Sequence, residues 1–315
     1  MSGALRRLLV SAVALLALRA PAAELELGVW VPRVLTGDPV SRAEWAQRAG
    51  DALGAASGIT IRGRAFSTFE DLTTFASSGR LALALVDPLA VLALADARIL
   101  AQGTGAEGPT PRLAVLTRTP QRGVLGLAGR PLGVARTTGA EPALLTHLAF
   151  GGQLDASTFF GARQEGELEQ VAEWVRAGRV EAMVAYEAQA PLWGLHVAAP
   201  LERLALPILV ELGGRLTEVD RVRLEAALRG DGVPLTATPA GVLGRLQALS
   251  RDYLAAVRRA VDGGGGPQRP VWAPGRTLTL EPNVPLQVRR APPLEPPRGR
   301  LRLPDFPEVE TGGGP

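Results

Sequence analysis

The sequence has 315 residues, enough for one large or two medium domains, and its 46% hydrophobic and 21% charged content is typical of a globular protein. All 34 basic residues are arginine, the formal net charge is only +3, and no basic cluster is interleaved with aromatic residues, which argues against nucleic acid as a partner. The count of 0 cysteines excludes a disulfide framework, a thiolate metal site and a cysteine nucleophile.

The N-terminal segment has the layout of a secretory signal peptide. Arg6 and Arg7 precede an apolar run over residues 8–18, and small residues follow at 20–23. The apolar run is too short to span a bilayer. We therefore expect residues 1–22 to be removed on export to the periplasm. Because no cysteine follows the cleavage site, we do not expect the lipid anchor of a bacterial lipoprotein.

The first half of the remaining chain alternates strand and helix patterns. Apolar residues at every second position predict strands, and Ser-x-x-Glu capping boxes predict helix starts. The run at 81–86 is apolar throughout, as in a strand covered on both faces of a parallel sheet. The predicted elements are strands at 24–31, 59–64, 81–86 and near residue 99, and helices from Ser41–Glu44 to Gly58, from Ser67–Glu70 to Gly79 and over 89–97.

The second half continues the same alternation. The clearest helix is predicted at 167–177, where apolar residues recur at helical spacing and Gly178 follows as a cap. The other predicted elements are strands at 112–119, 132–135, 180–186 and 206–212, a loop and short strand at 155–162, and helices beginning near Leu144, at Thr217–Asp220 and over 239–261.

Two segments of the chain repeat one pattern. Residues 69–88 read as a helix, Ser-Gly-Arg, a strand and Asp-Pro, whereas residues 168–187 read as a helix, Ala-Gly-Arg, a strand and Tyr-Glu. Such repetition predicts two similar α/β lobes. We expect lobe 1 at 23–114 and 200–262 and lobe 2 at 115–199, joined by two crossings. Four glycines then open a tail at 263–315 that holds 12 of the 26 prolines, and its composition predicts mostly disorder.

The succession of motifs resembles a known family. Five motifs follow the signal peptide in order, over roughly residues 24–230. They read ELELGVWVP, FSTFEDLTTFASSGRLALALVDPLAVL, LAGRPLGVARTTGAEPALLTHL, ELEQVAEWVRAGRVEAMVAYEA and LTEVDRVRLEAAL. They resemble the phosphate/phosphite/phosphonate-binding (PhnD-like) periplasmic proteins, the substrate receptors of ABC importers. The resemblance implies a two-lobed type II periplasmic-binding fold, without catalytic activity and without a cofactor. The tail has no counterpart in the family.

The resemblance also implies an anion seat after the strand at 132–135. In the family, hydroxyl and amide groups at a helix N-terminus of the second lobe bind the oxyanion. Thr137 and Thr138 occupy that place here, and Gly139 and Ala140 offer backbone N–H groups. Arg136 adjoins the seat and could add a contact. The alternative is that the threonines only cap the helix and that Arg136 is a solvated loop charge.

Four further residues are expected at strand ends, where ligands of open α/β sheets bind. Asp87 stands where the family has a glycine before proline, and it could repel an anion, bind an ammonium group or simply cap the helix after Pro88. Tyr186 and Glu187 match the turn after the last strand of lobe 2, and Trp30 ends the first strand. The alternatives are a surface strand end for the pair and a core or rim residue for Trp30. Phe66 and Ser67, at the end of the second strand, are expected near the same edge.

These observations predict a periplasmic solute-binding protein that captures a small oxyanion of the phosphate/phosphonate class between two lobes. An ABC permease in the inner membrane is the expected partner, and a monomer the expected state. An alternative is a sensor or scaffold derived from the same fold that acts through a protein partner. An enzyme is disfavoured. No metal site is expected because His147 and His196, the only histidines, have no accompanying carboxylate pattern.

Overall fold

The computed structural model describes residues 24–94, 96–136, 144–151, 154–251 and 253. The chain divides into one compact unit up to Arg276 and a second unit from Thr277. The predicted signal peptide, the predicted tail and the second unit all lie outside the described residues. The described part of the first unit is built on two β-sheets.

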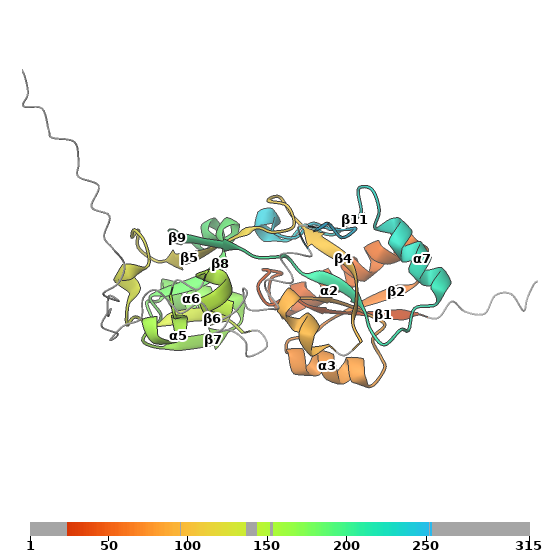
Figure 1. The fold of residues 1–315 in the computed structure, drawn as a ribbon, viewed down its shortest axis with the longest axis horizontal. Helices are drawn as coiled ribbons and strands as arrows, with labels where there is room; N and C mark the ends of the chain where they lie inside the picture. Colours follow the sequence, from red (N-terminus) through yellow and green to blue (C-terminus); the bar gives the residue numbers. More distant parts are fainter. Residues whose placement is uncertain (1–23, 95, 137–143, 152–153, 252, 254–315) are drawn as a thin grey trace, which may run out of the picture. The chain divides into compact units, whose positions relative to one another are not determined.

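The first sheet has seven strands in the order β11-β12-β4-β10-β3-β1-β2 (Figure 1). Its centre is parallel, with β1 between β2 and β3, and β10 runs antiparallel to both β3 and β4. The strands are β1 (Leu25–Trp30), β2 (Ile61–Ala65), β3 (Leu83–Val86), β4 (Arg98–Thr104), β10 (Ile208–Glu211), β11 (Val233–Pro234) and β12 (Arg245–Gln247).

Helices cover both faces of this sheet, and the side chains of β3 alternate between the two cores that these helices form. Leu83 and Leu85 of β3 join the core formed with α2 (Pro39–Ser57), whereas Ala84 and Val86 join a second core. That second core includes Leu72 of α3 (Phe69–Ser77). In Figure 1, α2 and α7 (Glu218–Ala227) accordingly lie on the opposite side of the sheet from α3. Successive side chains of a strand point to opposite faces, so an all-apolar strand requires cover on both sides.

The second sheet has five strands in the order β7-β6-β8-β5-β9. Its parallel part is β7-β6-β8, and β5 pairs antiparallel with β8 and β9. Leu168, Val171, Ala172 and Val175 of α6 pack on one face, as their spacing predicts. The elements are β5 (Arg112–Thr117), β6 (Leu132–Ala135), β7 (Arg163–Gly166), β8 (Ala182–Tyr186), β9 (His196–Arg203), α5 (Ala156–Phe159), α6 (Leu168–Arg176), the π-helix η3 (Leu144–Ala149) and the 3₁₀ helices η1 (Pro88–Ala93), η2 (Leu125–Leu127), η4 (Glu187–Trp193) and η5 (Pro239–Gly241).

Two connections join the sheets, residues 105–111 from β4 to β5 and residues 204–207 from β9 to β10. They hydrogen-bond to each other: the Leu204 N–H donates to the Pro111 carbonyl (3.0 Å) and the Leu206 N–H to the Pro109 carbonyl (2.9 Å). The exact limits of the two lobes stay a prediction.

The N-caps differ from expectation at two helices, by three positions at α2 and by one position at α3. Helix α2 begins at Pro39 with Asp38 as its N-cap, whose carboxylate accepts from the Ser41 N–H (2.8 Å), so Ser41 is not the cap. Proline suits a first helical position because its missing N–H would be unpaired there anyway. Helix α3 likewise is capped by Thr68 with Asp71 instead of Ser67 with Glu70. Gly58 ends α2 in the left-handed conformation, as predicted.

The predicted helix over 239–261 is wrong in its first part. The chain forms only the short η5 there and then β12, which pairs with β11 and β4. The Thr238 hydroxyl accepts from the Leu243 N–H (2.8 Å), and Ala240 has a positive φ of 60°, so the backbone folds into a tight loop. A hydroxyl that bonds to nearby backbone competes with helix formation. Residue 252 and residues from 254 on lie outside the described part.

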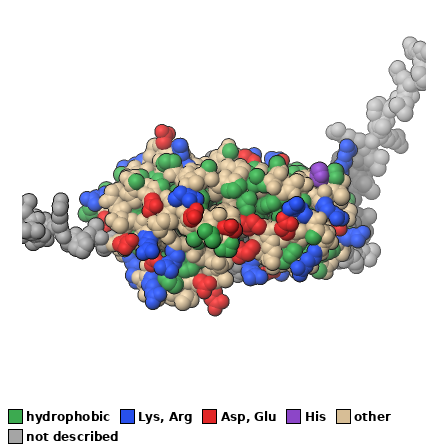
Figure 2. Space-filling model, turned by 180° about the vertical axis from the view of Figure 1, so that it is seen from behind, with side chains coloured by type: hydrophobic (Ala, Val, Ile, Leu, Met, Phe, Trp, Pro, Cys, Tyr) green, Lys and Arg blue, Asp and Glu red, His purple; other side chains and the backbone are tan. Residues whose placement is uncertain are grey.

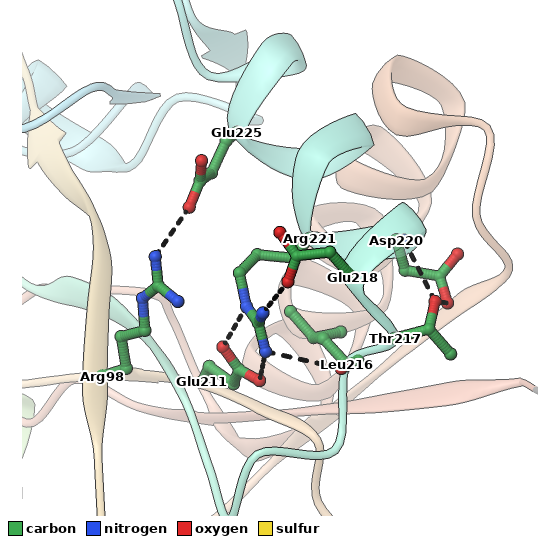
Figure 3. Close-up of polar contacts among 8 residues, drawn as sticks. All are labelled: Arg98, Glu211, Leu216, Thr217, Glu218, Asp220, Arg221 and Glu225. Carbon is green, nitrogen blue, oxygen red and sulfur yellow. Dashed lines mark hydrogen bonds and ion pairs between the residues drawn. The ribbon is translucent and has the colours of Figure 1, made fainter.

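A carboxylate–arginine network holds α7 to the first sheet (Figure 3). Glu211 of β10 is 1% exposed, and it accepts from Arg221 of α7 at Nη2 (2.9 Å) and Nε (3.0 Å). Arg221 also pairs with Glu218, and Arg98 of β4 pairs with Glu225 of α7 (3.2 Å). The hydrogen bonds from Arg221 hold the pKa of Glu211 below its ordinary value, against the opposing effect of burial.

We expect this network to make stability depend on pH. Because the folded-state pKa of Glu211 is depressed, its stabilisation is complete above the unfolded-state pKa and is lost as pH falls through the folded-state pKa. Glu211→Gln should lower the free energy of unfolding at pH 7 and flatten its decline in acid. Urea unfolding between pH 7 and pH 2 measures both. Glu44→Gln is the control, because Glu44 and its partner Arg48 are exposed; an equal effect of the two changes contradicts the assignment.

Candidate ligand-binding site

A hollow of about 460 Å³, counted with the solvent at its mouth, opens at the carboxyl ends of strands from both sheets. The turn after β1, the end of β2, the end of β6 and the junction of β7 with α6 all reach it. This is where topology places ligands in open α/β sheets. We call it the upper hollow. Its lining residues are Val29, Trp30, Val31, Pro32, Val34, Thr36, Arg42, Phe66, Ser67, Arg136, Gly166, Glu167, Leu168 and Glu169.

Aromatic side chains form the first-sheet wall of the upper hollow. Trp30 is 4% exposed, and its ring packs against Phe69 at 5.0 Å between centroids. Phe66 packs edge-on against Phe75 at 5.3 Å. Both residues line the hollow while belonging to the core beneath it. Trp30 is thus a core residue that also lines the hollow, and its contact with a ligand stays a prediction.

An ion pair joins the two sides of the upper hollow. Arg42 of α2 contacts Glu167, the N-cap of α6, at 3.0 Å. Glu169, two residues after Glu167, lines the same hollow. Burial raises the pKa of the Glu169 carboxyl, Arg42 lowers it and Glu167 raises it. Arg136 at the end of β6 is exposed, and its backbone N–H bonds to the Gly166 carbonyl (2.9 Å). The hollow thus holds two arginines and two carboxylates.

A buried polar cluster lies beside this hollow. Arg33, in the turn after β1, is ion-paired with Asp87, and their side chains are 7% and 2% exposed. Asp87 directly follows β3; its N–H donates to the Trp30 carbonyl (3.2 Å), and its carbonyl accepts from Ala90 (2.9 Å) as η1 begins. The turn after one parallel strand and the end of its neighbour thereby meet at the same sheet edge, although 54 residues separate the pair in sequence.

Two tyrosines join the cluster to a connection between the sheets. The Tyr186 hydroxyl, at the end of β8, donates to the Ala205 carbonyl across 3.4 Å, and the Tyr253 hydroxyl donates to the Leu206 carbonyl. Burial raises the pKa of Tyr186 far above its usual range; Arg33 lowers it and Asp87 raises it. Burial also raises the pKa of Tyr253, so both phenols are neutral donors at physiological pH.

The structure places the predicted site residues in two groups. Trp30 and Arg136 line the upper hollow together with Phe66 and Ser67. Asp87 and Tyr186 belong to the Arg33 cluster, and Glu187 is half-buried at the start of η4. The predicted seat Thr137, Thr138, Gly139 and Ala140 lies outside the described residues.

Sequence reasoning missed four charged residues at these sites, namely Arg33, Arg42, Glu167 and Glu169. The glutamates follow β7 directly and begin α6, and a polar residue at that junction is a usable signal. Arg33 stands in a proline-containing loop and has no distinguishing sequence pattern.

Within the described ranges, no three histidine, cysteine or acidic side chains cluster so as to hold a metal ion. The helices of that part include none with the length and apolar character needed to cross a bilayer. On the face shown in Figure 2, arginine and acidic side chains are interspersed among apolar ones.

No protein-family model matches the sequence, and no curated protein matches it. Solved structures do match. A binding-protein component of an ABC phosphonate transporter from Pseudomonas aeruginosa (PA3383) superposes with a TM-score of 0.58 at 14% identity, covering 75% of this chain and 85% of its own.

Two further structures show the same likeness. PhnD1 from Prochlorococcus marinus in complex with methylphosphonate gives a TM-score of 0.55 at 12% identity, over 76% of this chain and 98% of its own. XAC2383 from Xanthomonas citri bound to ATP gives 0.57 at 14% identity, over 77% and 97%. The chain therefore has the mixed α/β, PhnD-like type II fold of periplasmic binding proteins.

Proposed function

We propose that the protein is a periplasmic solute-binding protein that captures a small oxyanion of the phosphate/phosphonate class and delivers it to an ABC permease. The observation that carries the proposal is the upper hollow, which lies at strand ends of both sheets and is lined by Arg42 of α2 and by Arg136 directly after β6. PhnD1 was solved with methylphosphonate, and PA3383 is a binding-protein component of a phosphonate transporter, which supports a binding role for this chain. Because these proteins are only 12% and 14% identical to this chain, its own residues decide which ligand it binds.

The proposed mechanism is a hinge motion in which the two lobes, each built on one of the two sheets, close around the ligand. The connections 105–111 and 204–207 are short and bonded to each other, as suits a hinge between two rigid bodies. An oxyanion would exchange contacts with the Arg42–Glu167 pair as the hollow closes. Arginine fits an oxyanion because its fixed fork of N–H groups matches the oxygens. We also assign Thr137, Thr138, Gly139 and Ala140 to the oxyanion on the strength of the sequence pattern.

A thermal-unfolding screen tests the proposal. The purified protein is heated with phosphate, phosphite, methylphosphonate, 2-aminoethylphosphonate and propanesulfonate. A ligand at 100 times its dissociation constant stabilises by about 2.7 kcal/mol, so at least one member should raise the midpoint clearly. Thr138→Ala should then weaken the active ligand by about 1.5–3 kcal/mol, the contribution of a hydrogen bond to a charged group.

Thr74→Ala is the matched control, because Thr74 is exposed on α3. It should leave the affinity unchanged. If no oxyanion raises the midpoint, the proposed function is wrong. If Thr138→Ala and Thr74→Ala behave alike, the seat at 137–140 is wrong although binding stands.

A further inference from the structure

Arg33 presents hydrogen-bond donors that no described group accepts. Its Nε and Nη1 atoms are buried and have no hydrogen-bond partner in the described part of the chain, while Nη2 donates to Asp87. Arg33 also lies close enough to the Tyr186 hydroxyl for hydrogen bonding between them to lower the pKa of that phenol. The Nε and Nη1 atoms carry three of the five N–H groups of a guanidinium. Buried donors are normally satisfied, and an unsatisfied one in a native structure requires an explanation.

The side chain of Arg33 lines a second hollow of about 340 Å³, again counted with the solvent at its mouth, which we call the lower hollow. The turn after β1 separates the two hollows: Val31, Pro32 and Val34 line the upper one, whereas Arg33 lines the lower one. Apart from Arg33, the described lining is entirely aliphatic, formed by Leu113, Val134, Ala135, Leu145, Ala149 and Val184.

The surrounding contacts fix Arg33 in this position. Asp87 holds its Nη2, and the buried Gln189 donates its Nε2 to the Arg33 carbonyl across 3.4 Å. Gln189 is 0% exposed, so it orients the turn from within the core. A charged fork held in advance loses little conformational entropy when it binds a ligand.

The charges of the cluster limit the ligand. Arg33 and Asp87 together are neutral, and the neighbouring Tyr186 is a neutral phenol. A singly charged anion leaves one net negative charge in this buried site, whereas a doubly charged anion leaves two. Burial of uncompensated charge is strongly unfavourable, so the second charge weakens binding. The aliphatic lining in turn favours a ligand with an apolar substituent.

We propose that Arg33 is the anchor for the ligand's anionic group and that the lower hollow selects a singly charged oxyanion with an apolar substituent over inorganic phosphate. This inference rests on the proposed function: it names the charge class of the captured oxyanion, and it assigns the anionic group to Arg33 in the lower hollow instead of to Arg42 and Arg136 in the upper hollow. Asp87 is the ion-pair partner of Arg33 and not a ligand contact.

The test compares propanesulfonate, which carries one charge, with inorganic phosphate by calorimetric titration of the purified protein at pH 8. The wild type should bind propanesulfonate at least about tenfold more tightly. Asp87→Asn keeps Arg33 and removes the nearby negative charge, so it should tighten propanesulfonate binding by about fivefold or more. Arg33→Gln/Asp87→Asn differs from that variant only at Arg33, and it should bind about 10- to 100-fold more weakly than Asp87→Asn.

Arg62→Gln, on the exposed side of β2, is the control and should match the wild type. Three results would each overturn this inference and leave the proposed function standing. They are equal propanesulfonate affinity of Asp87→Asn and the double variant, weaker propanesulfonate binding by Asp87→Asn than by the wild type, and equal wild-type affinity for phosphate and propanesulfonate. If the double variant does not fold, the direction of the Asp87→Asn effect decides. Failure of every oxyanion in the screen overturns the proposed function, and this inference with it.

Discussion

Arg33→Met is expected to lower the free energy of unfolding by about 3–5 kcal/mol, the usual effect of removing one partner from a buried ion pair. The Asp87 carboxylate is 2% exposed, and in this variant it stays buried after the arginine that neutralises it is gone. Urea unfolding at pH 7 gives the difference. The loss is a large fraction of the 5–15 kcal/mol that stabilises a typical domain.

The double variant Arg33→Met/Asp87→Asn separates lost charge compensation from lost packing. With both charges removed, most of the stability should return, because a neutral pair of similar volume often replaces a buried ion pair at little loss. A double variant as unstable as Arg33→Met shows that packing of the arginine stem, and not its charge, stabilises this turn.

Gly63→Ala is the second substitution with a large expected effect. A Cβ atom at Gly63 of β2 would lie 1.7 Å from the carbonyl oxygen of Ala46 in α2, and one at Gly50 of α2 would lie 2.5 Å from the Gly63 backbone nitrogen. Helix and strand thus touch backbone to backbone here. Since the obstacle is main chain and not a flexible side chain, α2 must move away from the sheet, with a loss of about 3 kcal/mol.

Gly244→Ala is the matched control, because an added Cβ at Gly244 meets nothing within 4 Å. It should change the unfolding free energy by less than about 0.5 kcal/mol, or raise it slightly by restricting the unfolded chain. Thermal and urea unfolding of the two variants give the comparison. Similar stability of Gly63→Ala and Gly244→Ala would falsify the close approach of α2 to β2.

The alternation of strands and helices was readable from the sequence because each element buries one defined face. The apolar spacing of α6 and the all-apolar β3 carry their packing in their own residues. The local cap at Thr217, whose hydroxyl accepts from the Asp220 N–H (3.1 Å), was readable as well, whereas the caps Asp38 and Thr68 were missed because a Ser-x-x-Glu pattern lies next to each of them. The resemblance in fold follows from the same local signals repeated along the chain, whereas the order of the strands in each sheet was not predicted.

Other features depend on contacts that periodicity does not encode. Val242 and Leu246 suit a helical face as well as they suit a loop and strand, and the Thr238–Leu243 bond decides for the latter. Arg33 is an ordinary loop residue in the sequence, and only the meeting of the β1 turn with the end of β3 gives it Asp87 as a partner. The predicted seat at 137–140 stays a prediction.

Titration of the wild-type protein with small oxyanions tests the central claim most directly, because it asks whether the hollows between the two sheets take an anion at all. We predict saturable binding of one propanesulfonate or methylphosphonate per chain, together with a rise in the unfolding midpoint, and weaker binding of inorganic phosphate. Absence of both heat and stabilisation with every oxyanion of the screen would contradict the account.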